Sequence, residues 1–259
     1  MKAMILAAGL GTRLRPLTED CPKALVPVAG RTMLEIALTR LRAFGVREAI
    51  VNVHHFADMI AEYLSANANF GMRIEVSREE ALLDTGGGLK KAARFFLETG
   101  GNTQQPFIVH NVDVISTIDL GGMLRFHTEH DALATLAVQD RETSRYLLFD
   151  EHGQLRGRRD ARPDRSAVAA MAKQARAELA GPATGVAALA FSGIHVLSPQ
   201  IFAKIEEEGA FSIIDTYLRL AAQGENIIAF RADGSYWRDL GRPENVMQAA
   251  FDIESGKYS

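Results

Sequence analysis

Two glycines and two basic residues near the N-terminus are the residues best suited to phosphate chemistry. Gly9 and Gly11 lie in a turn that follows an apolar run, and Arg13 and Lys23 come shortly after it. Glycine lets backbone N–H groups approach a phosphate closely, because it has no Cβ and tolerates positive φ. Arginine contacts phosphate oxygens as a planar fork, and lysine does so as a point charge. The segment is therefore predicted to bind a polyphosphate at the end of a buried strand.

Two common phosphate-binding motifs do not fit this segment. A P-loop requires Gly-Lys followed by Ser or Thr, and the segment has no such triplet. A dinucleotide-binding fingerprint requires a third glycine, where this chain has Leu14, and an acidic residue about twenty positions on, where the stretch 28–32 has none. These differences argue against a nicotinamide-dependent oxidoreductase. An ordinary strand and turn with exposed basic residues is the remaining simple alternative.

The elements that must position these residues alternate between strands and helices. The hydrophobic pattern predicts strands over 2–8, 49–53, 72–76 and 107–110, and helices over 33–44, around 59–64 and over 86–96. Such alternation indicates a parallel sheet with right-handed crossovers. Ligands of these sheets bind beyond the carboxyl ends of the strands. The glycine turn and Asp113, which follows a later strand, are therefore expected at one edge of the sheet.

The second half of the chain has a less regular pattern. Paired strands are predicted over 132–138 and 145–149, and further strands and helices over 189–196, 199–207, 213–222, 227–231, 236–239 and from Pro243 onward. The stretch 156–183 is rich in Ala, Arg and small polar residues, and it is expected to be a lid or a partly helical excursion. No repeat or linker divides the chain, so 1–259 is predicted to be a single domain.

The composition excludes several classes of protein. A hydrophobic content of 47% and a charged content of 24% are those of an ordinary globular protein. The formal net charge of −3 gives no general basic field, so neither nucleic acid nor a membrane is expected as a partner. The single cysteine, Cys21, rules out an intramolecular disulfide and fits a reducing compartment. No secretory leader or spanning run is recognisable, so a cytoplasmic location is expected.

Five blocks, in order along the chain, resemble the signatures of the sugar-1-phosphate nucleotidyltransferases, also called nucleoside-diphosphate-sugar pyrophosphorylases. The blocks are 9–13 with 22–27, 84–88, 111–113, 191–194 and 237–241. The resemblance implies a Rossmann-like three-layer αβα nucleotidyltransferase fold, of the α/β class, with a mostly parallel central sheet. It further implies that 1–120 forms mainly the nucleotide-binding half and 121–259 mainly the sugar-phosphate-binding half.

The reaction implied by the resemblance transfers a nucleotidyl group from a nucleoside triphosphate to a sugar-1-phosphate and releases pyrophosphate. Such a transfer needs two anions held together and charge neutralised on the transferred phosphorus. Mg²⁺ held by one or two carboxylates is the usual solution. Asp113 and Asp239 match the metal ligands of the family, and Arg13 and Lys23 match its catalytic basic residues. The product would serve nucleotide-sugar biosynthesis for the cell wall.

The resemblance also assigns binding residues. Those expected to bind the nucleotide are Ala8, Gly9, Gly11, Thr12, Arg13, Lys23, Thr85, Gly86, Gly87 and Asn111. Those expected to bind the sugar phosphate are Gly88, Ser192, Gly193 and Asp239. Within the first set, Thr85 and the glycines after it would approach the edge of the nucleobase.

Two positions depart from the family pattern. Val112 stands where the family usually has Gly, which affects how closely the backbone can approach the nucleotide. Many members also carry a Glu-Lys-Pro segment whose lysine holds the sugar phosphate. The comparable stretch here is 154–158, in which Arg156 or Arg158 is the candidate replacement.

The resemblance leaves the substrates open. The blocks 84–88 and 191–194 are most similar to those of uridylyltransferases that act on N-acetylmuramate-1-phosphate, which favours UTP. Guanylyltransferases of mannose- or heptose-1-phosphate and thymidylyltransferases share much of the pattern. A catalytically silent relative that binds a nucleotide sugar and regulates a partner is the competing class. The oligomeric state is also open, with a homodimer as one arrangement.

Other polar residues are expected to be structural. Packing or loop solvation is the favoured role for His54, His55 and His110. Asp215 is expected to be a solvent-facing helix charge, and 206–208, a run of three glutamates, is expected to be a solvated helix end.

Overall fold

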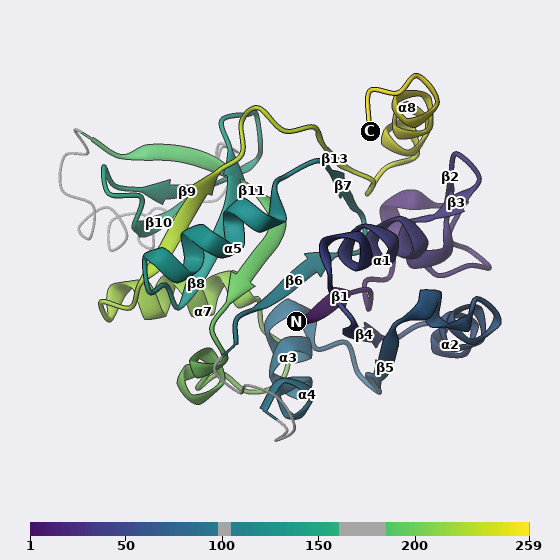
Figure 1. Ribbon diagram of the computed structural model, residues 1–259, viewed down its shortest axis with the longest axis horizontal. Coiled ribbons are helices and arrows are strands. Elements are labelled where there is room, and N and C mark those ends of the chain that lie inside the picture. Colours follow the sequence, from purple (N-terminus) through teal and green to yellow (C-terminus); the bar gives the residue numbers. More distant parts are fainter. Residues whose placement is uncertain (98–104, 161–184, 259) are drawn as a thin grey trace, which may run out of the picture.

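A central sheet carries the chain's chemistry-bearing turns at one edge. The computed structural model describes residues 1–97, 105–160 and 185–258 (Figure 1). The nine strands of the sheet within those residues are β1 (Lys2–Leu6), β4 (Glu48–Val53), β5 (Arg73–Arg78), β6 (Phe107–Asn111), β8 (Ala134–Gln139), β9 (Arg145–Phe149), β10 (Leu155–Asp160), β11 (Ala187–Leu197) and β12 (Ile227–Arg231).

The core of the sheet is parallel, as predicted. Strands β6, β1, β4 and β5 lie side by side in this order and run in the same direction. Antiparallel pairing begins at β11, which lies beside β6 and extends the sheet toward β9 and β10. Strand β8 pairs antiparallel with β11 and parallel with β12. The turns after β1, β4 and β6 therefore open at the same edge of the sheet.

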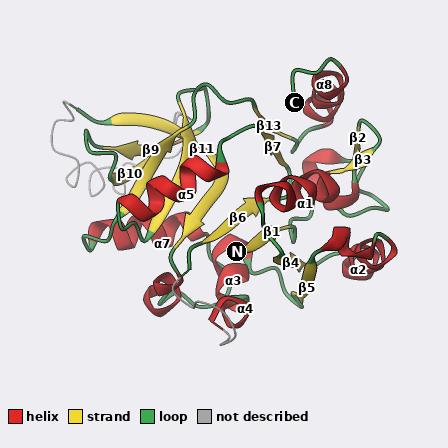
Figure 2. Ribbon diagram, viewed as in Figure 1, coloured by secondary structure: helices red, strands yellow, loops and turns green. Residues whose placement is uncertain are grey.

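Helices cover both faces and complete three αβα layers (Figure 2). The apolar cluster on one face includes residues from α1 (Met33–Phe44), α2 (Ala57–Ala66), α5 (Leu120–Glu129) and α8 (Pro243–Glu254). The cluster on the other face includes residues from α3 (Asp84–Lys91), α4 (Ala93–Leu97) and α7 (Ile213–Ala222). The two clusters are separated by the sheet, so the predicted layered architecture is confirmed.

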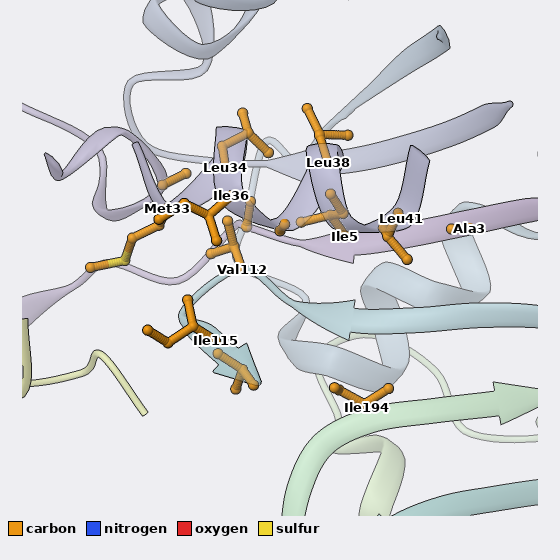
Figure 3. Close-up of a cluster of buried hydrophobic side chains, with 14 of the residues drawn as sticks. Ala3, Ile5, Met33, Leu34, Ile36, Leu38, Leu41, Val112, Ile115 and Ile194 are labelled. Carbon is orange, nitrogen blue, oxygen red and sulfur yellow. The ribbon is translucent and has the colours of Figure 1, made fainter. Parts of the chain in front are cut away.

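Helix α1 shows how local sequence fixes one of these layers. The Thr32 side chain accepts a hydrogen bond from the backbone N–H of Glu35, which caps the first turn, and Gly45 ends the helix at φ 106°. Its apolar positions recur every three to four residues and face β1 and the turn after β6 (Figure 3). Leu34, Leu38 and Leu41 are all fully buried in the apolar cluster on this face of the sheet. Burial of each such side chain stabilises the fold by about 1.5–3 kcal/mol.

Two small sheets complete the fold. One is the hairpin of β2 (Pro27–Val28) and β3 (Arg31–Thr32), and the other pairs β7 (Val114–Ser116) with β13 (Trp237–Asp239). The second pair is antiparallel and joins the segment after β6 to the segment before α8, as Figure 1 shows near its centre. It thus brings two regions more than a hundred residues apart in sequence to one place.

Some sequence-based expectations were wrong. The strands predicted over 132–138 and 145–149 exist as β8 and β9, but they do not pair with each other. Both pair with the long strand β11, from opposite edges, since Ala190 pairs with Gln139 of β8 and with Tyr146 of β9. The register of the β8–β11 pairing also shifts between Phe191 and His195. Residues 156–160, expected to begin a lid or a partly helical excursion, instead belong to strand β10, and the remainder of that stretch, 161–183, lies outside the described residues.

Smaller differences concern helices. The helix predicted over 86–96 is two helices, α3 and α4, and the one predicted over 199–207 is a 3₁₀ helix over Pro199–Lys204. Helix α5 and strand β7 were not anticipated. None of the helices in the described residues is both long and apolar enough to span a lipid bilayer.

Candidate active site

The glycine turn after β1 is shaped for close approach. Gly11 adopts φ 65°, and a Cβ there would lie 3.0 Å from the methyl group of Thr18 and 3.1 Å from Cβ of Lys23. The Thr18 hydroxyl donates to the carbonyl of Gly11 at 2.8 Å and so fixes the turn. Gly9 has open space around it, and Thr12 and Arg13 are exposed. The turn therefore presents backbone and guanidinium groups to solvent from a rigid base.

Lys23 and Asp113 form an ion pair at the centre of the site. Lys23 begins a 3₁₀ turn after Pro22, and Asp113 lies in the tight turn between β6 and β7. The Lys23 ammonium donates to Oδ2 of Asp113, and the two side chains are only 11% and 15% exposed. A charge pair this well shielded from water interacts strongly. It sits between the glycine turn and the end of β6.

The β7–β13 pair brings the second carboxylate to this point. Asp239 is the register partner of Val114, and the backbone N–H of Leu240 donates to the carbonyl of Asp113 at 2.7 Å. Oδ1 of Asp239 accepts from the N–H of Gly241 at 2.7 Å. A Cβ on Gly241 would lie 2.9 Å from Nη2 of Arg13, so the Arg13 guanidinium packs against this turn.

The carboxylates of Asp113 and Asp239 are suited to a divalent ion whose coordination is completed by the substrate. No group of three or more His, Cys, Asp or Glu side chains that could hold a metal occurs in 1–97, 105–160 or 185–258. Asp113 and Asp239 lie on adjoining segments of the chain, and a cationic group, the Lys23 ammonium, already contacts Asp113. Mg²⁺ is commonly held by one or two carboxylates together with phosphate oxygens and water. The donor set of Asp113 and Asp239 fits such an ion.

A cavity of about 200 Å³ opens beside the ion pair. It lies between the glycine turn, the ends of β4 and β6, and the start of α3, as expected for a ligand at the carboxyl edge of a parallel sheet. Its lining residues are Leu6, Ala7, Ala8, Gly9, Lys23, Asn52, Leu82, Asp84, Thr85, Asn111, Val112 and Asp113. The structure thus brings together the predicted residues Ala8, Gly9, Lys23, Thr85 and Asn111.

The three glycines that follow Thr85 are buried by packing. A Cβ on Gly86 would overlap the ring of Phe211, and one on Gly87 would overlap the carbonyl of Gly209. A Cβ on Gly88 would lie 2.7 Å from both Asn52 Nδ2 and Glu79 Oε1. The N–H of Gly86 donates to the carbonyl of Phe211 at 2.9 Å. These glycines let α3 pack closely, and their expected contacts with base or sugar stay predictions.

A second cavity, of about 550 Å³, adjoins the first at Asn111. It extends over the β7–β13 pair toward β9, β10 and the start of α7. Its lining residues are Arg13, Asn111, Val114, Arg141, Glu142, Thr143, Arg145, Leu147, Arg158, Phe191, Ser192, Gly193, Ser212, Ile214, Trp237, Asp239 and Arg242. The predicted sugar-site residues Ser192, Gly193 and Asp239 all lie here.

A kink in β11 shapes this cavity. Gly193 adopts φ 73°, and a Cβ there would lie 2.9 Å from Nδ2 of Asn111. The indole N–H of Trp237 donates to the carbonyl of Ser192 at 2.8 Å. The guanidinium of Arg141 lies 3.5 Å from the centre of the Trp237 ring and donates to the carbonyl of Phe191 at 2.9 Å. Burial lowers the pKa of Arg141 below its usual value, and the neighbouring Asp239 offsets part of this decrease.

Sequence reasoning missed most of the arginines of this cavity. Arg141, Arg145 and Arg242 stand outside the recognised blocks, and no spacing rule links them to Asp239. Arg158, one of the two suggested replacements for the missing lysine, does line the cavity. The other, Arg156, instead pairs with Asp150 at 2.7 Å.

The side chain of Val112 packs into the core, and the residue also borders the smaller cavity. It is 3% exposed and lies within the apolar cluster under α1, as Figure 3 shows. Its backbone N–H donates to the carbonyl of Leu6 at 3.1 Å, which continues the pairing of β1 with β6. A valine is therefore accommodated by the core at this position.

The surroundings of His54 and His110 agree with the structural roles expected for them. Burial lowers the pKa of His110 to about 4, and the imidazole is completely buried beside β11. Nδ1 of His54 lies 2.8 Å from the carbonyl of Glu79, whereas His55 is exposed. Asp215 is exposed, as expected, and pairs with Arg158 at 3.1 Å.

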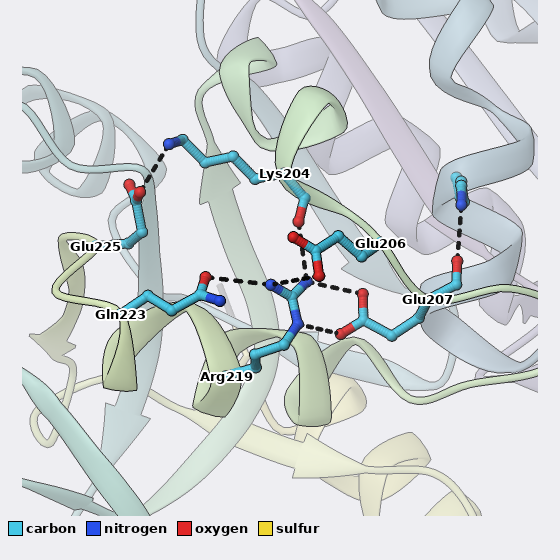
Figure 4. A network of polar contacts seen from close by, with 7 residues as sticks. Lys204, Glu206, Glu207, Arg219, Gln223 and Glu225 are labelled. Carbon is cyan, nitrogen blue, oxygen red and sulfur yellow. Dashed lines mark hydrogen bonds and ion pairs between the residues drawn. The ribbon is translucent and has the colours of Figure 1, made fainter.

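Of the three glutamates at 206–208, Glu206 and Glu208 are exposed, as expected, whereas Glu207 is held in a network of polar contacts (Figure 4). Arg219 of α7 donates to both carboxylate oxygens of Glu207, at 2.8 and 3.0 Å. Lys90 of α3 donates to the carbonyl of Glu207 at 2.7 Å and to the carboxylate of Glu208 at 2.6 Å. The network ties α3, α7 and the turn against which the α3 glycines pack.

Comparison with known proteins identifies the family of the chain. A family model described as nucleotidyl transferase matches residues 2–256. The chain therefore belongs to the nucleotidyl transferase family, and its relatives are sugar-1-phosphate nucleotidyltransferases, as predicted.

Two relatives illustrate the range of substrates. N-acetylmuramate alpha-1-phosphate uridylyltransferase of Caulobacter vibrioides is 34% identical over 258 residues, which cover 95% of this chain and 94% of that protein. Mannose-1-phosphate guanylyltransferase 1 of Arabidopsis thaliana is 31% identical over 251 residues, which cover 95% of this chain and 63% of that longer protein.

Solved structures share the fold. UDP-glucose pyrophosphorylase complexed with UDP-glucose matches with a TM-score of 0.74 at 17% identity, over 98% of each chain. HddC from Yersinia pseudotuberculosis complexed with GMP-PN matches with a TM-score of 0.71 at 22% identity, over 97% of this chain and 99% of the other.

Proposed function

We propose that this protein transfers a uridylyl group from UTP to an acidic sugar-1-phosphate and releases pyrophosphate. Residues 1–120 would bind mainly the nucleotide, and 121–259 mainly the sugar phosphate. This division is supported by the cavities, because the smaller one is lined only by residues between 6 and 113. All but three residues of the larger one come from positions 141–242.

The observation that carries the proposal is the charge of the larger cavity. Besides Arg13, which would hold the triphosphate, its lining contains four arginines, Arg141, Arg145, Arg158 and Arg242, but only two acidic residues, Glu142 and Asp239. The acceptor phosphate must lie near the Lys23–Asp113 pair, at one end. Arg145 and Arg158 stand apart from it, at the β9–β10 end. Arg158 already pairs with Asp215, so Arg145 is the residue that favours a second anionic group on the sugar.

The roles of the chain's residues follow from their placement. The glycine turn and Arg13 would hold the β- and γ-phosphates and stabilise the charge of the leaving pyrophosphate. Lys23 would contact the phosphates at the reacting centre, and in doing so it would release Asp113. The acceptor phosphate oxygen would then attack the α-phosphorus in line, without a covalent enzyme intermediate. Mg²⁺, held by Asp113 and Asp239, would neutralise phosphate charge.

The choice of UTP over GTP is supported by the similarity over nearly the full length to a uridylyltransferase. A guanylyltransferase of mannose- or heptose-1-phosphate is the second candidate. It is supported by relatives of 29–31% identity, including the Arabidopsis protein. Use of an acidic acceptor distinguishes the two candidate functions, because mannose-1-phosphate has no anionic group besides its phosphate.

A pyrophosphate-release assay with a matched pair of acceptors tests the proposal. N-acetylmuramate-1-phosphate and N-acetylglucosamine-1-phosphate differ only by a lactyl ether that carries a carboxylate. Each is offered with UTP, GTP, TTP and CTP. The proposal expects turnover with UTP and at least about tenfold higher kcat/KM for the acidic sugar, the effect of one charged contact. Equal kcat/KM values for the two sugars would contradict the proposal that the acceptor is acidic. Tight nucleotide binding without turnover for any pair of substrates would indicate a catalytically silent relative.

A further inference from the structure

A buried hydrogen-bonded chain runs beside the smaller cavity, which Asn52 lines, and connects the glycine turn with the start of α3. Oδ1 of Asn52 accepts from the backbone N–H of Ala7 at 2.8 Å, and Nδ2 donates to Oε1 of Glu79 at 2.7 Å. Oε2 of Glu79 accepts from the backbone N–H of Leu83 at 3.0 Å. Ala7 opens the glycine turn, and Leu83 is the residue before α3.

The orientation of this chain follows from the donors and acceptors. A backbone N–H can only donate, so the atom of Asn52 that faces Ala7 must be its oxygen, and the amide NH₂ must then face Glu79. Glu79 accepts through both oxygens, as an ionised carboxylate does, and both of these donors are neutral amides. Neither side chain carries surface solvation, since Asn52 is 2% and Glu79 is 4% exposed.

The surroundings leave the chain little freedom. The backbone N–H of Glu79 donates to the carbonyl of Val53 at 2.7 Å, which fixes it beside the end of β4. Gly88 of α3 packs directly on the pair, and any Cβ there would lie 2.7 Å from both Asn52 Nδ2 and Glu79 Oε1. The carbonyl of Leu83 accepts from the N–H of Phe211 at 3.1 Å. The pair therefore sets the distance between the glycine turn and the segment 82–85.

We propose that Asn52 and Glu79 are positioning residues, which hold the phosphate-binding wall and the α3 wall of the nucleotide cavity in register. This inference rests on the proposed function in one respect, that the smaller cavity receives the nucleoside triphosphate. A preformed cavity spares the nucleotide the free-energy cost of ordering two loops when it binds. Loss of the pair then weakens nucleotide binding and leaves the chemical step and the sugar phosphate nearly unaffected.

The reciprocal exchange of the two side-chain types gives a sharp test. In Glu79→Gln, the amide cannot accept from both Asn52 and Leu83, and in Asn52→Asp two carboxylates face each other at hydrogen-bond distance. In the double variant N52D/E79Q, the new carboxylate at position 52 accepts from Ala7 and from the new amide at position 79. The oxygen of that amide accepts from Leu83. Every hydrogen bond is restored, and the net charge of the native pair is kept.

The affinity for UTP is measured by calorimetry without a sugar phosphate, and KM values for UTP and for the acceptor are measured in the assay above. Each single variant is expected to weaken UTP binding by about tenfold or more, since one buried hydrogen bond to a charged group is lost. The double variant is expected to return to within about threefold of the native affinity, by the logic of a double-mutant cycle.

Thr135→Val is the matched control, because it removes the buried hydrogen bond between the Thr135 hydroxyl and Nδ1 of His127, which lie 2.9 Å apart and outside both cavities. It is expected to lower the melting temperature without changing the affinity for UTP. The proposal is overturned if folded single variants bind UTP as the native protein does, or if the double variant binds no better than the weaker single one. If a single variant does not fold, the folded double variant and its UTP affinity still decide the question. Binding of UTP without turnover would contradict the proposed function alone.

Discussion

Replacement of Gly193 by alanine tests the kink of β11 that shapes the larger cavity. Gly193 has φ 73°, and an added Cβ would lie 2.9 Å from Asn111 Nδ2 and 3.0 Å from Val114 Cγ2. An L-residue in left-handed backbone costs about 1–2 kcal/mol. Overpacking of a well-filled site costs about 1–3 kcal/mol more. We therefore expect Gly193→Ala to lose about 2–5 kcal/mol of the free energy of unfolding.

Gly256→Ala separates the two contributions, because Gly256 has the same φ of 73° but no atom within 4 Å of an added Cβ. Urea unfolding, followed by the fluorescence of Trp237, gives both free energies. The difference between the two variants measures the contacts alone and is expected to be about 1–3 kcal/mol. We also expect a raised KM for the sugar phosphate in Gly193→Ala, because the added methyl group displaces Asn111. A difference between the variants below about 0.5 kcal/mol, with an unchanged KM, would refute the tight kink.

Three further predictions concern the reacting centre and the pH dependence of folding. Arg13→Ala is expected to lower kcat by ~10²–10³, the scale for one preorganised charge-stabilising group, and a loss below about threefold in steady-state turnover would place Arg13 away from the transferred phosphate. Asp113→Ala is expected to abolish Mg²⁺-dependent turnover while circular dichroism remains native, and retained activity would remove this carboxylate from the metal site. Burial lowers the pKa of His110 and of His127 to about 4, and that of His195 to about 3. These three histidines contribute their full stabilisation above pH 6.5, where they are neutral. As the pH falls from 6.5 toward 4, each is expected to lower the free energy of unfolding by about 1.4 kcal/mol per pH unit, because the unfolded chain binds protons first. Urea midpoints that stay constant between pH 7 and pH 5 would contradict this.

The parallel half of the fold was predictable because its signals are local. The apolar run before Gly9, the capped helix that ends at Gly45 and the strand that ends at Asn111 each carry their own pattern. The glycine turn and Asp113 could be placed at one edge, because strand–helix alternation fixes the direction of the strands.

The antiparallel half was less predictable because its pairing is set at long range. The strands β8 and β9 are neighbours in sequence, yet both pair with β11, whose register shifts near Gly193. Nothing within either strand reports that shift.

The same limit applies to the site. The aspartates could be inferred from motifs, but the arginines of the larger cavity come from separate elements that only the tertiary fold brings together. Asn52 and Glu79 were missed because a hydrogen-bond chain between a strand end and a loop leaves no periodic or spacing signal. The three glycines after Thr85 stand out in the sequence, but either contact with a ligand or close packing of α3 could explain them. Close packing accounts for their need to be small, whatever else they contact.

Transfer of the α-phosphate is the most direct test of the central claim. The protein is incubated with Mg²⁺, N-acetylmuramate-1-phosphate and UTP labelled at the α-phosphorus, and the products are separated by chromatography. The account predicts that the label appears in a nucleotide sugar, with one pyrophosphate released for each molecule formed and no label bound to the protein. Label recovered only as UMP, on the protein or as unreacted UTP would contradict it.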